Sequence, residues 1–215
     1  MRFFTEADRA EIQAAVAEAE GRSAGEIVPY AVSACDDYQE ARWRGTTLAA
    51  LLGSLAAALV HALGGYWGEL LDLWIAVPPV AGAAFGYLAV QACPWLRRTL
   101  AGPELLERRV AQRAAAAFLE AEVFATRDRT GILILVALFE RRVVVLGDAG
   151  INARVQQHEW DHIVAGIVAG IRAGTPGKAL ADGIRACGAL LERPGMERRA
   201  DDTDELPNQL RTGEP

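Results

Sequence analysis

Two apolar runs of strand-forming residues lie close together within residues 130–151, TGILILVALFERRVVVLGDAGI. The runs at 132–139 and 143–146 are rich in β-branched residues and do not alternate with polar ones, so neither strand can leave a face in water. Glu140 and Arg141 between them predict a tight turn. We therefore expect a β-hairpin that is covered by helices on both faces.

A helix and a short strand are predicted before this hairpin. Thr5 and Asp8 have the spacing of a capping box, and apolar residues then recur at helical spacing up to Gly21. Residues 26–33, EIVPYAVS, form a short apolar run. Because Pro29 cannot donate a ladder hydrogen bond, we expect this strand at an edge of the sheet.

Two long stretches, residues 45–63 and 73–96, carry no formal charge. At about 1.5 Å per residue, each would span the roughly 30 Å hydrocarbon layer of a bilayer. A pair of helices buried in a soluble core is the alternative, but a domain of this size has little protein to surround them. The expected transmembrane hairpin has a tryptophan near each of its four helix ends, where indole rings favour the headgroup region. These are Trp43, Trp67, Trp74 and Trp95.

The charges that flank the two stretches predict their orientation. Arginines border the outer ends, whereas the connecting loop carries only acidic charges, so the positive-inside rule places both outer ends in the cytoplasm. The residues are Arg42, Arg44, Arg97 and Arg98 outside, and Glu69 and Asp72 in the loop. The chain enters the first stretch soon after the strand at 26–33, so we expect the turn at 140–142 on the membrane side of the sheet.

Small residues one helical turn apart predict where the two membrane helices meet. The first stretch has Gly53 and Ala57, and the second has Gly82 and Gly86. Such faces let backbones approach closely where lipid provides no hydrophobic drive. The sequence leaves open whether they meet within one chain or between two.

The remainder of the chain predicts three helices and a tail. Pro103 opens an Ala-, Glu- and Arg-rich helix that we expect to reach Gly131, and an apolar stripe over 155–174 and a pattern over 176–191 predict two more. The assembled fold is a small mixed-sheet α/β sandwich with an inserted two-helix transmembrane hairpin. We expect a cytoplasmic domain from 1–44 and 97–195, the hairpin at 45–96, and a mobile tail at 196–215.

Charge and cysteine content narrow the functional classes. A net charge of −6 argues against sequence-independent nucleic-acid binding, which needs a basic surface. The cysteines are odd in number, far apart and without CxxC spacing, so neither a disulfide framework nor a structural zinc site is indicated.

Oxygen ligands for a hard cation are expected at one edge of the sheet. Glu26 starts the first strand, Thr130 starts the second and Asp148 ends the third, so one parallel and one antiparallel pairing bring all three to the same edge. Ca²⁺ or Mg²⁺ are the cations that such a site would take. Ordinary turn chemistry for Asp148 and a solvated strand end for Glu26 are the alternative.

Two further motifs match catalytic patterns less well. The segment HEWDH places His158 and His162 at zinc-peptidase spacing, but both lie nearly opposite the apolar stripe of their helix and should face solvent. Cys187 and Arg193 have the spacing of cysteine phosphatases, but the cysteine lies inside a helical pattern, which favours a packing role.

Taken in order, these segments resemble the TPM domain family, in particular its bacterial membrane branch. The matching pieces include GEIV at 25–28, the membrane hairpin, the segment 130–151, CGALL at 187–191 and DDTDELPNQL at 201–210. The resemblance implies a divalent-metal binder, a weak acid phosphatase, or an accessory factor in the assembly or repair of membrane complexes.

We expect a multi-pass protein of the bacterial inner membrane, with its α/β domain in the cytoplasm and an accessory or scaffolding role rather than catalysis. Its expected partners are the lipid bilayer and either a membrane protein or a second copy of the chain that meets the small-residue faces. A metal-dependent acid phosphatase is the alternative, and a zinc metallopeptidase that uses HEWDH is the third hypothesis.

Overall fold

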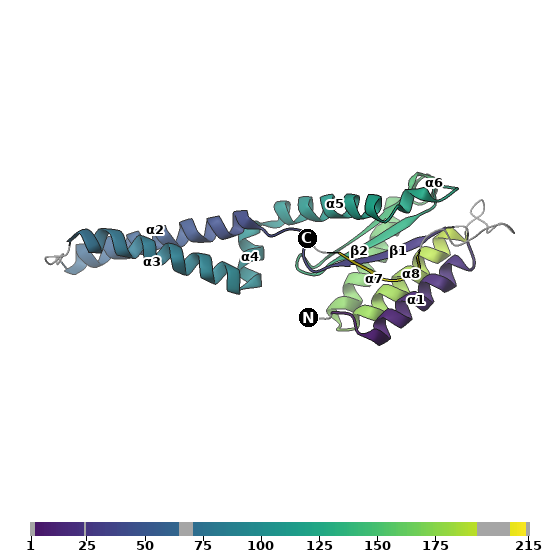
Figure 1. Cartoon of the computed structure of the whole chain (residues 1–215), viewed down its shortest axis with the longest axis horizontal. Helices are drawn as coiled ribbons and strands as arrows, with labels where there is room; N and C mark the ends of the chain where they lie inside the picture. Colours follow the sequence, from purple (N-terminus) through teal and green to yellow (C-terminus); the bar gives the residue numbers. More distant parts are fainter. Residues whose placement is uncertain (1–2, 24, 65–70, 193–206, 214–215) are drawn as a thin grey trace. The chain divides into compact units, whose positions relative to one another are not determined.

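A mixed sheet of four strands organises the larger part of the computed structural model, which describes residues 3–23, 25–64, 71–192 and 207–213 (Figure 1). The order is β3–β2–β1–β4; β1 is parallel to β2 and β4, and β3 is antiparallel to β2. The expected α/β fold with a mixed sheet is thus confirmed. The strands are β1 (Ile27–Val32), β2 (Ile132–Ala137), β3 (Arg142–Gly147) and β4 (Arg211–Gly213).

The position of β1 differs from the sequence prediction, because it lies between β2 and β4 rather than at an edge. The carbonyl of Glu26 accepts the N–H of Ile132 in β2, and the carbonyl of Val32 accepts the N–H of Leu138, which follows β2. The backbone N–H and C=O groups of every second residue of β1 therefore point toward β2. Pro29 therefore points to the other side, and β4 pairs only from Tyr30 onward. The missing donor of the proline interrupts neither ladder.

Helices cover both faces of the sheet. This was predicted from the two apolar runs, in which apolar residues do not alternate with polar ones. Ile134 and Val136 share one core with α1, α7 and α8, whereas Leu133 and Leu135 share a second core with the later part of α5. Figure 1 shows α1, α7 and α8 together on one side. The edge strand β3 is only half-buried, so the expectation of full burial holds for β2 and is wrong for β3. These helices are α1 (Glu6–Glu20), α5 (Pro103–Glu120), α7 (Gln157–Arg172) and α8 (Pro176–Leu191), with short η1 (Val123–Ala125) and α6 (Ala149–Asn152) between.

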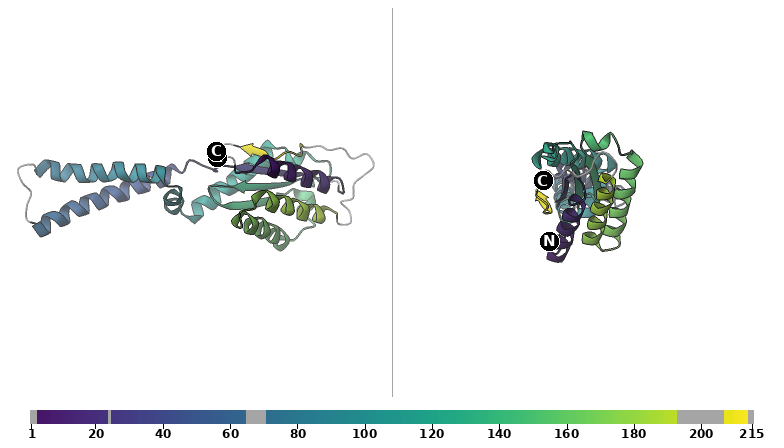
Figure 2. Two further views of the ribbon diagram at one scale, coloured as in Figure 1. Left: turned by 90° about the horizontal axis from the view of Figure 1, so that it is seen from below. Right: turned by 90° about the vertical axis from the view of Figure 1, so that its right-hand side faces the viewer.

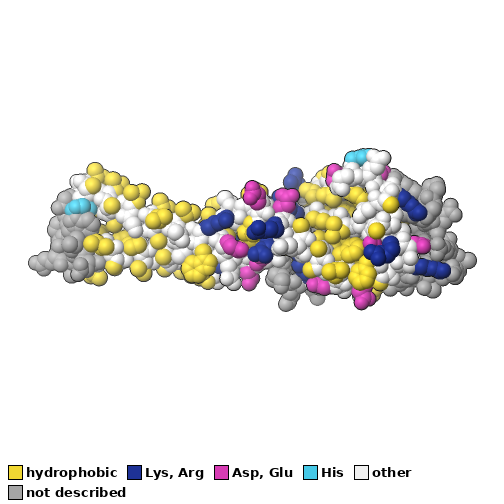
Figure 3. Space-filling model, turned by 90° about the horizontal axis from the view of Figure 1, so that it is seen from above, with side chains coloured by type: hydrophobic (Ala, Val, Ile, Leu, Met, Phe, Trp, Pro, Cys, Tyr) yellow, Lys and Arg dark blue, Asp and Glu magenta, His cyan; other side chains and the backbone are white. Residues whose placement is uncertain are grey.

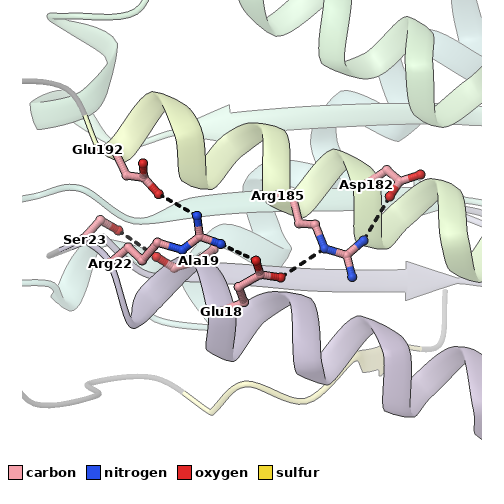
Figure 4. Close-up of polar contacts among 7 residues, drawn as sticks. All are labelled: Glu18, Ala19, Arg22, Ser23, Asp182, Arg185 and Glu192. Carbon is pink, nitrogen blue, oxygen red and sulfur yellow. Dashed lines mark hydrogen bonds and ion pairs between the residues drawn. The ribbon is translucent and has the colours of Figure 1, made fainter.

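Polar contacts on the surface bind α1 to α8 (Figure 4). The capping box predicted at the start of α1 is present, with Thr5 and Asp8 exchanging hydrogen bonds. Farther along, Glu18 accepts from both Arg22 and Arg185, and the Arg185 bond is 3.2 Å long. Because these ion pairs are exposed, they add little to the stability of the fold.

Two chain segments differ from their predicted form. α5 ends at Glu120 instead of continuing toward Gly131, because the chain turns through a left-handed residue, Glu122 (φ 54°), which brings Val123 into the core. The prediction of a mobile tail over 196–215 is wrong at residues 207–213, where Leu210 enters a core and β4 joins the sheet (Figure 2, yellow strand). Residues 193–206 lie outside the described part of the chain.

Residues 36–108 form a separate unit built on a helical hairpin. Its helices are α2 (Gln39–Gly64), α3 (Leu71–Ala92) and α4 (Pro94–Ala101), followed by the start of α5. α3 ends earlier than the predicted stretch 73–96, because Pro94 opens a new helix and forces Cys93 into an extended conformation.

Glycines form the seam between α2 and α3. A Cβ atom added to Gly82 would lie 2.3 Å from the Ala49 carbonyl oxygen, and one added to Gly53 would lie 2.4 Å from that of Pro78. Gly86 meets Gly45 in the same way. Gly53, Gly82 and Gly86 therefore all face the neighbouring helix of the same chain, but Gly53 lies against Pro78 and not against the Gly82/Gly86 face.

The outer surface of this hairpin is apolar. Leu52 and Leu55 on α2 are each 64% exposed and Phe85 on α3 is 72% exposed. Figure 3 shows such side chains along the hairpin in yellow. Both helices are long and apolar enough to cross a membrane.

Candidate functional site

The three residues expected at one edge of the sheet do lie at that edge. In the register Ile27 lies opposite Ile132, which in turn lies opposite Gly147. Glu26 precedes β1, Thr130 lies just before β2 and Asp148 directly follows β3, and all three are buried. Topology inferred from the sequence thus placed them correctly.

Asp148 is held by two hydrogen bonds from one arginine. Its Oδ2 accepts from Nε of Arg129 at 2.5 Å, its Oδ1 accepts from Nη2 at 2.9 Å, and Oδ1 also accepts from the N–H of Ala149 at 2.7 Å. Burial alone would raise the pKa of Asp148, but the hydrogen bonds and the charge of Arg129 hold it below its usual value. The carboxylate is therefore ionised at neutral pH and already serves a bidentate partner.

Close backbone packing fixes the loop that carries Arg129. This residue adopts a left-handed conformation (φ 57°), and its carbonyl accepts from the N–H of Gly150 at 2.9 Å. A Cβ on Gly150 would lie 2.3 Å from the Asp128 carbonyl oxygen, and one on Gly131 only 2.1 Å from that of Val123. Neither glycine has a positive φ; both permit the close approach of two backbones.

Other polar groups at this edge perform structural tasks. Glu20 is buried at the end of α1 and accepts the N–H of Ile27 at 3.0 Å, which ties the helix to the start of β1. The N–H of Thr130 donates to the hydroxyl of Thr126 at 3.1 Å. Among the residues that the structure describes, no three His, Cys, Asp or Glu side chains are grouped so that they could hold a metal ion.

Arg129 was missed by sequence reasoning. The signal that could have found it is its place in the sequence, because this basic residue directly precedes Thr130, one of the three expected oxygen ligands. Any cation at this edge has to compete with its guanidinium for Asp148.

The HEWDH segment forms the first turns of α7. His158 and His162 are exposed, as predicted, while Trp160 packs in the core. The carboxylate of Glu159 accepts the N–H of Gln156 at 3.0 Å in a capping box. The glutamate that a zinc peptidase would use as a base therefore caps the helix.

Cys187 is a packing residue of α8, as predicted. It is completely buried, and this burial raises its pKa to about 12. A thiol in this setting is not a nucleophile at neutral pH. Arg193, its partner in the phosphatase-like spacing, lies outside the described residues.

Comparison with known proteins bears on the whole arrangement. The family model described as the TPM domain matches residues 100–190, which contain β2, β3, α7 and nearly all of α8. The resemblance to the TPM domain family is confirmed. No curated protein matches the chain.

The solved NMR structure of the BA42 protein from the psychrophilic bacterium Bizionia argentinensis is similar to this TPM-like fold. Its TM-score is 0.59 at 21% sequence identity, over 99% of this chain and 97% of that one. At this identity the likeness shows the fold alone.

Proposed function

We propose that the chain is a membrane-anchored accessory or scaffolding protein whose hairpin holds the TPM-like unit at the inner face of a bacterial plasma membrane. The observation that carries this proposal is the apolar outer surface of α2 and α3. Leaving one leucine in water rather than burying it costs about 1.5–3 kcal/mol, and the hairpin exposes many apolar side chains. A bilayer removes that cost, while the glycine seam supplies the close packing that lipid does not drive.

A partner in the membrane would meet the outer faces of the hairpin. Gly82 and Gly86 face α2 of the same chain, so their surfaces are already used. A membrane protein or a second copy would therefore contact leucine-rich surface such as that around Leu55. We infer that the chain acts there in the assembly or maintenance of a membrane complex.

Flotation of carbonate-washed membranes tests the anchoring. The native chain should float with the lipid, and the variant Leu52→Asp/Val80→Asp should not, because a charge at the centre of a membrane helix costs about 2.5–3.5 kcal/mol. Leu119→Asp is the control, since Leu119 is equally exposed on α5. Loss of the native chain to the soluble fraction would refute the anchoring.

The accessory role is tested by cross-linking in cells and purification from solubilised membranes. A defined complex should copurify with the native chain and be absent with Leu52→Asp/Val80→Asp. Unchanged amounts of every membrane complex in cells that lack the chain would refute the role.

A metal-dependent phosphatase is the competing function, favoured by the position of Glu26, Thr130 and Asp148 at one edge of the sheet. We infer that Ca²⁺ or Mg²⁺ binding at this edge would compete with Arg129, so Arg129→Gln should tighten binding of the cation in calorimetry. Asp148→Asn should then abolish both that binding and any cation-dependent hydrolysis of phosphate esters. Identical titrations for all three chains would remove the edge as a cation site.

A further inference from the structure

A pocket of about 410 Å³ lies between the end of the β2–β3 hairpin and α7. Its volume is within the roughly 300–1,000 Å³ range of small-molecule sites. Apolar side chains from both elements form its walls, among them Val136, Val143, Val168 and Ile171. Phe3 closes one side and is itself 39% exposed.

Three arginines complete the lining. Arg141 and Arg142 come from the strand turn, and Arg172 comes from the last turn of α7. Among the residues that the structure describes, the lining includes no Asp or Glu, although the chain as a whole has a net charge of −6. Arg141 is held at the tip of the turn by its left-handed backbone (φ 56°) and by an N–H that donates to the Leu138 carbonyl at 3.3 Å.

The combination of an apolar wall and a cationic rim defines the ligand chemistry. Guanidinium groups bind phosphate oxygens through paired N–H donors, whereas valine and isoleucine walls give nothing to an inorganic anion. A ligand that uses both parts has an anionic head group at one end and a hydrocarbon chain at the other, as a phospholipid does.

We propose that this pocket binds one anionic phospholipid, with its phosphate at the arginine rim and part of an acyl chain against the apolar wall. The proposal rests on the proposed membrane anchoring, because the bilayer supplies the lipid. Ala137 lines the pocket and is the register partner of Val32, and residues 33–38 then connect β1 to α2. The pocket thus lies at the end of the sheet from which the chain continues to the hairpin.

Photo-crosslinking in nanodiscs tests the proposal with the full chain. The discs contain phosphatidylcholine and a small fraction of phosphatidylglycerol that bears a diazirine in its acyl chain. We expect label on peptides that contain Val143 or Val168, and little label there from the equivalent phosphatidylcholine probe. Equal labelling by the two probes would overturn the proposal.

Charge variants sharpen the test. Arg141→Gln/Arg172→Gln should lower the pocket label about tenfold or more, since each arginine near an anionic headgroup contributes roughly a fivefold factor. Arg154→Gln/Lys178→Gln removes the same charge from exposed positions outside the pocket and should leave the label unchanged. Arg141→Lys/Arg172→Lys should restore only part of it, because lysine keeps the charge but lacks the paired N–H donors. An equal loss in both Gln double variants would show that only overall charge matters.

Two further measurements separate the outcomes. Flotation of the discs confirms insertion first; a chain that does not insert refutes the anchoring, whereas a chain that inserts without pocket label refutes only the lipid site. Inorganic phosphate is then added as a competitor. Loss of the label at millimolar phosphate would show a site for free phosphate and contradict the lipid assignment.

Discussion

The leucines of β2 and those of α2 have opposite surroundings. Leu133 and Leu135 are fully buried between two layers, whereas Leu52 and Leu55 lie on the outside of their helix. Water would penalise the second arrangement by kilocalories for each side chain, but hydrocarbon would not. Under the proposed anchoring, leucine therefore meets two different solvents within one chain.

The two units also differ in what holds them together. The sheet unit interlocks apolar side chains in two cores, one on each face. In the hairpin the closest contacts are backbone to backbone, at Gly82 and Gly53. A domain that folds in water buries its large apolar side chains. Helices that pack in lipid instead turn them outward and have small residues at their contact.

A matched pair of Leu→Ala substitutions should give the largest difference between the units. Leu133→Ala opens a cavity in a full core and should lower the free energy of unfolding by about 2–5 kcal/mol. Leu52→Ala removes a side chain that contacts the surroundings, so we expect a change below about 0.5 kcal/mol. Hydrogen exchange of the β2 and α2 amides in the full chain measures both. Comparable losses would show that α2 is also packed against protein.

A smaller effect is expected from Gly82→Ala. The added Cβ would meet the Ala49 carbonyl, so α2 and α3 have to separate at a cost of about 1–3 kcal/mol. Gly64→Ala is the matched control, because no atom of the described residues lies within 4 Å of a Cβ at that position. Titration from maltoside into dodecyl sulfate, followed by circular dichroism, should show early loss of the hairpin only for Gly82→Ala. Coincident curves would contradict the seam.

The smallest effect concerns the sheet edge. Because the pKa of Asp148 is lowered in the fold, its pairing with Arg129 stabilises the protein above the ordinary aspartate pKa, and this stability is lost as the pH falls through the lowered value. Asp148→Asn should remove this contribution to the pH dependence of the unfolding free energy, while the side chain still caps the start of α6. Asp148→Ala should cost a further amount of about 1 kcal/mol through the lost cap.

Unfolding free energies measured against pH decide this prediction. Asp161→Asn, which changes an exposed aspartate of α7, should leave the profile of the native chain intact. A profile for Asp148→Asn that superimposes on the native one would mean that the ion pair does not stabilise the fold.

Strong periodic patterns made much of this fold predictable. The unbroken apolar run at 132–139 predicted helices on both faces of the sheet. The uncharged stretches at 45–63 and 73–96 predicted a helical hairpin separate from the sheet. The strand β4 was not predictable, because three residues form no period and Leu210 is a single anchor after a polar segment. The end of α5 at Glu120 was not predicted either, because the helix-forming residues continue past it in the sequence. The left-handed turn at Glu122 depends on tertiary packing instead.

The candidate edge shows the same division. The lengths of the connections predicted the strand directions. The position of Glu26, Thr130 and Asp148 at one edge of the sheet could therefore be predicted. The bidentate contact from Arg129 depends on the left-handed backbone of one loop residue, which no local pattern specifies. Side-chain pairing across a loop is decided by the packed structure.

Cysteine reactivity in native membrane vesicles tests the central claim most directly. Leu55 and Leu119 are both 64% exposed, one on the hairpin and one on α5. Each is changed to cysteine in a chain whose Cys35, Cys93 and Cys187 have been replaced, and N-ethylmaleimide, which crosses bilayers but reacts with the thiolate formed in water, is added. The account predicts fast labelling at position 119 and labelling at position 55 only after denaturation; equal rates in the vesicles would contradict a hairpin in the membrane.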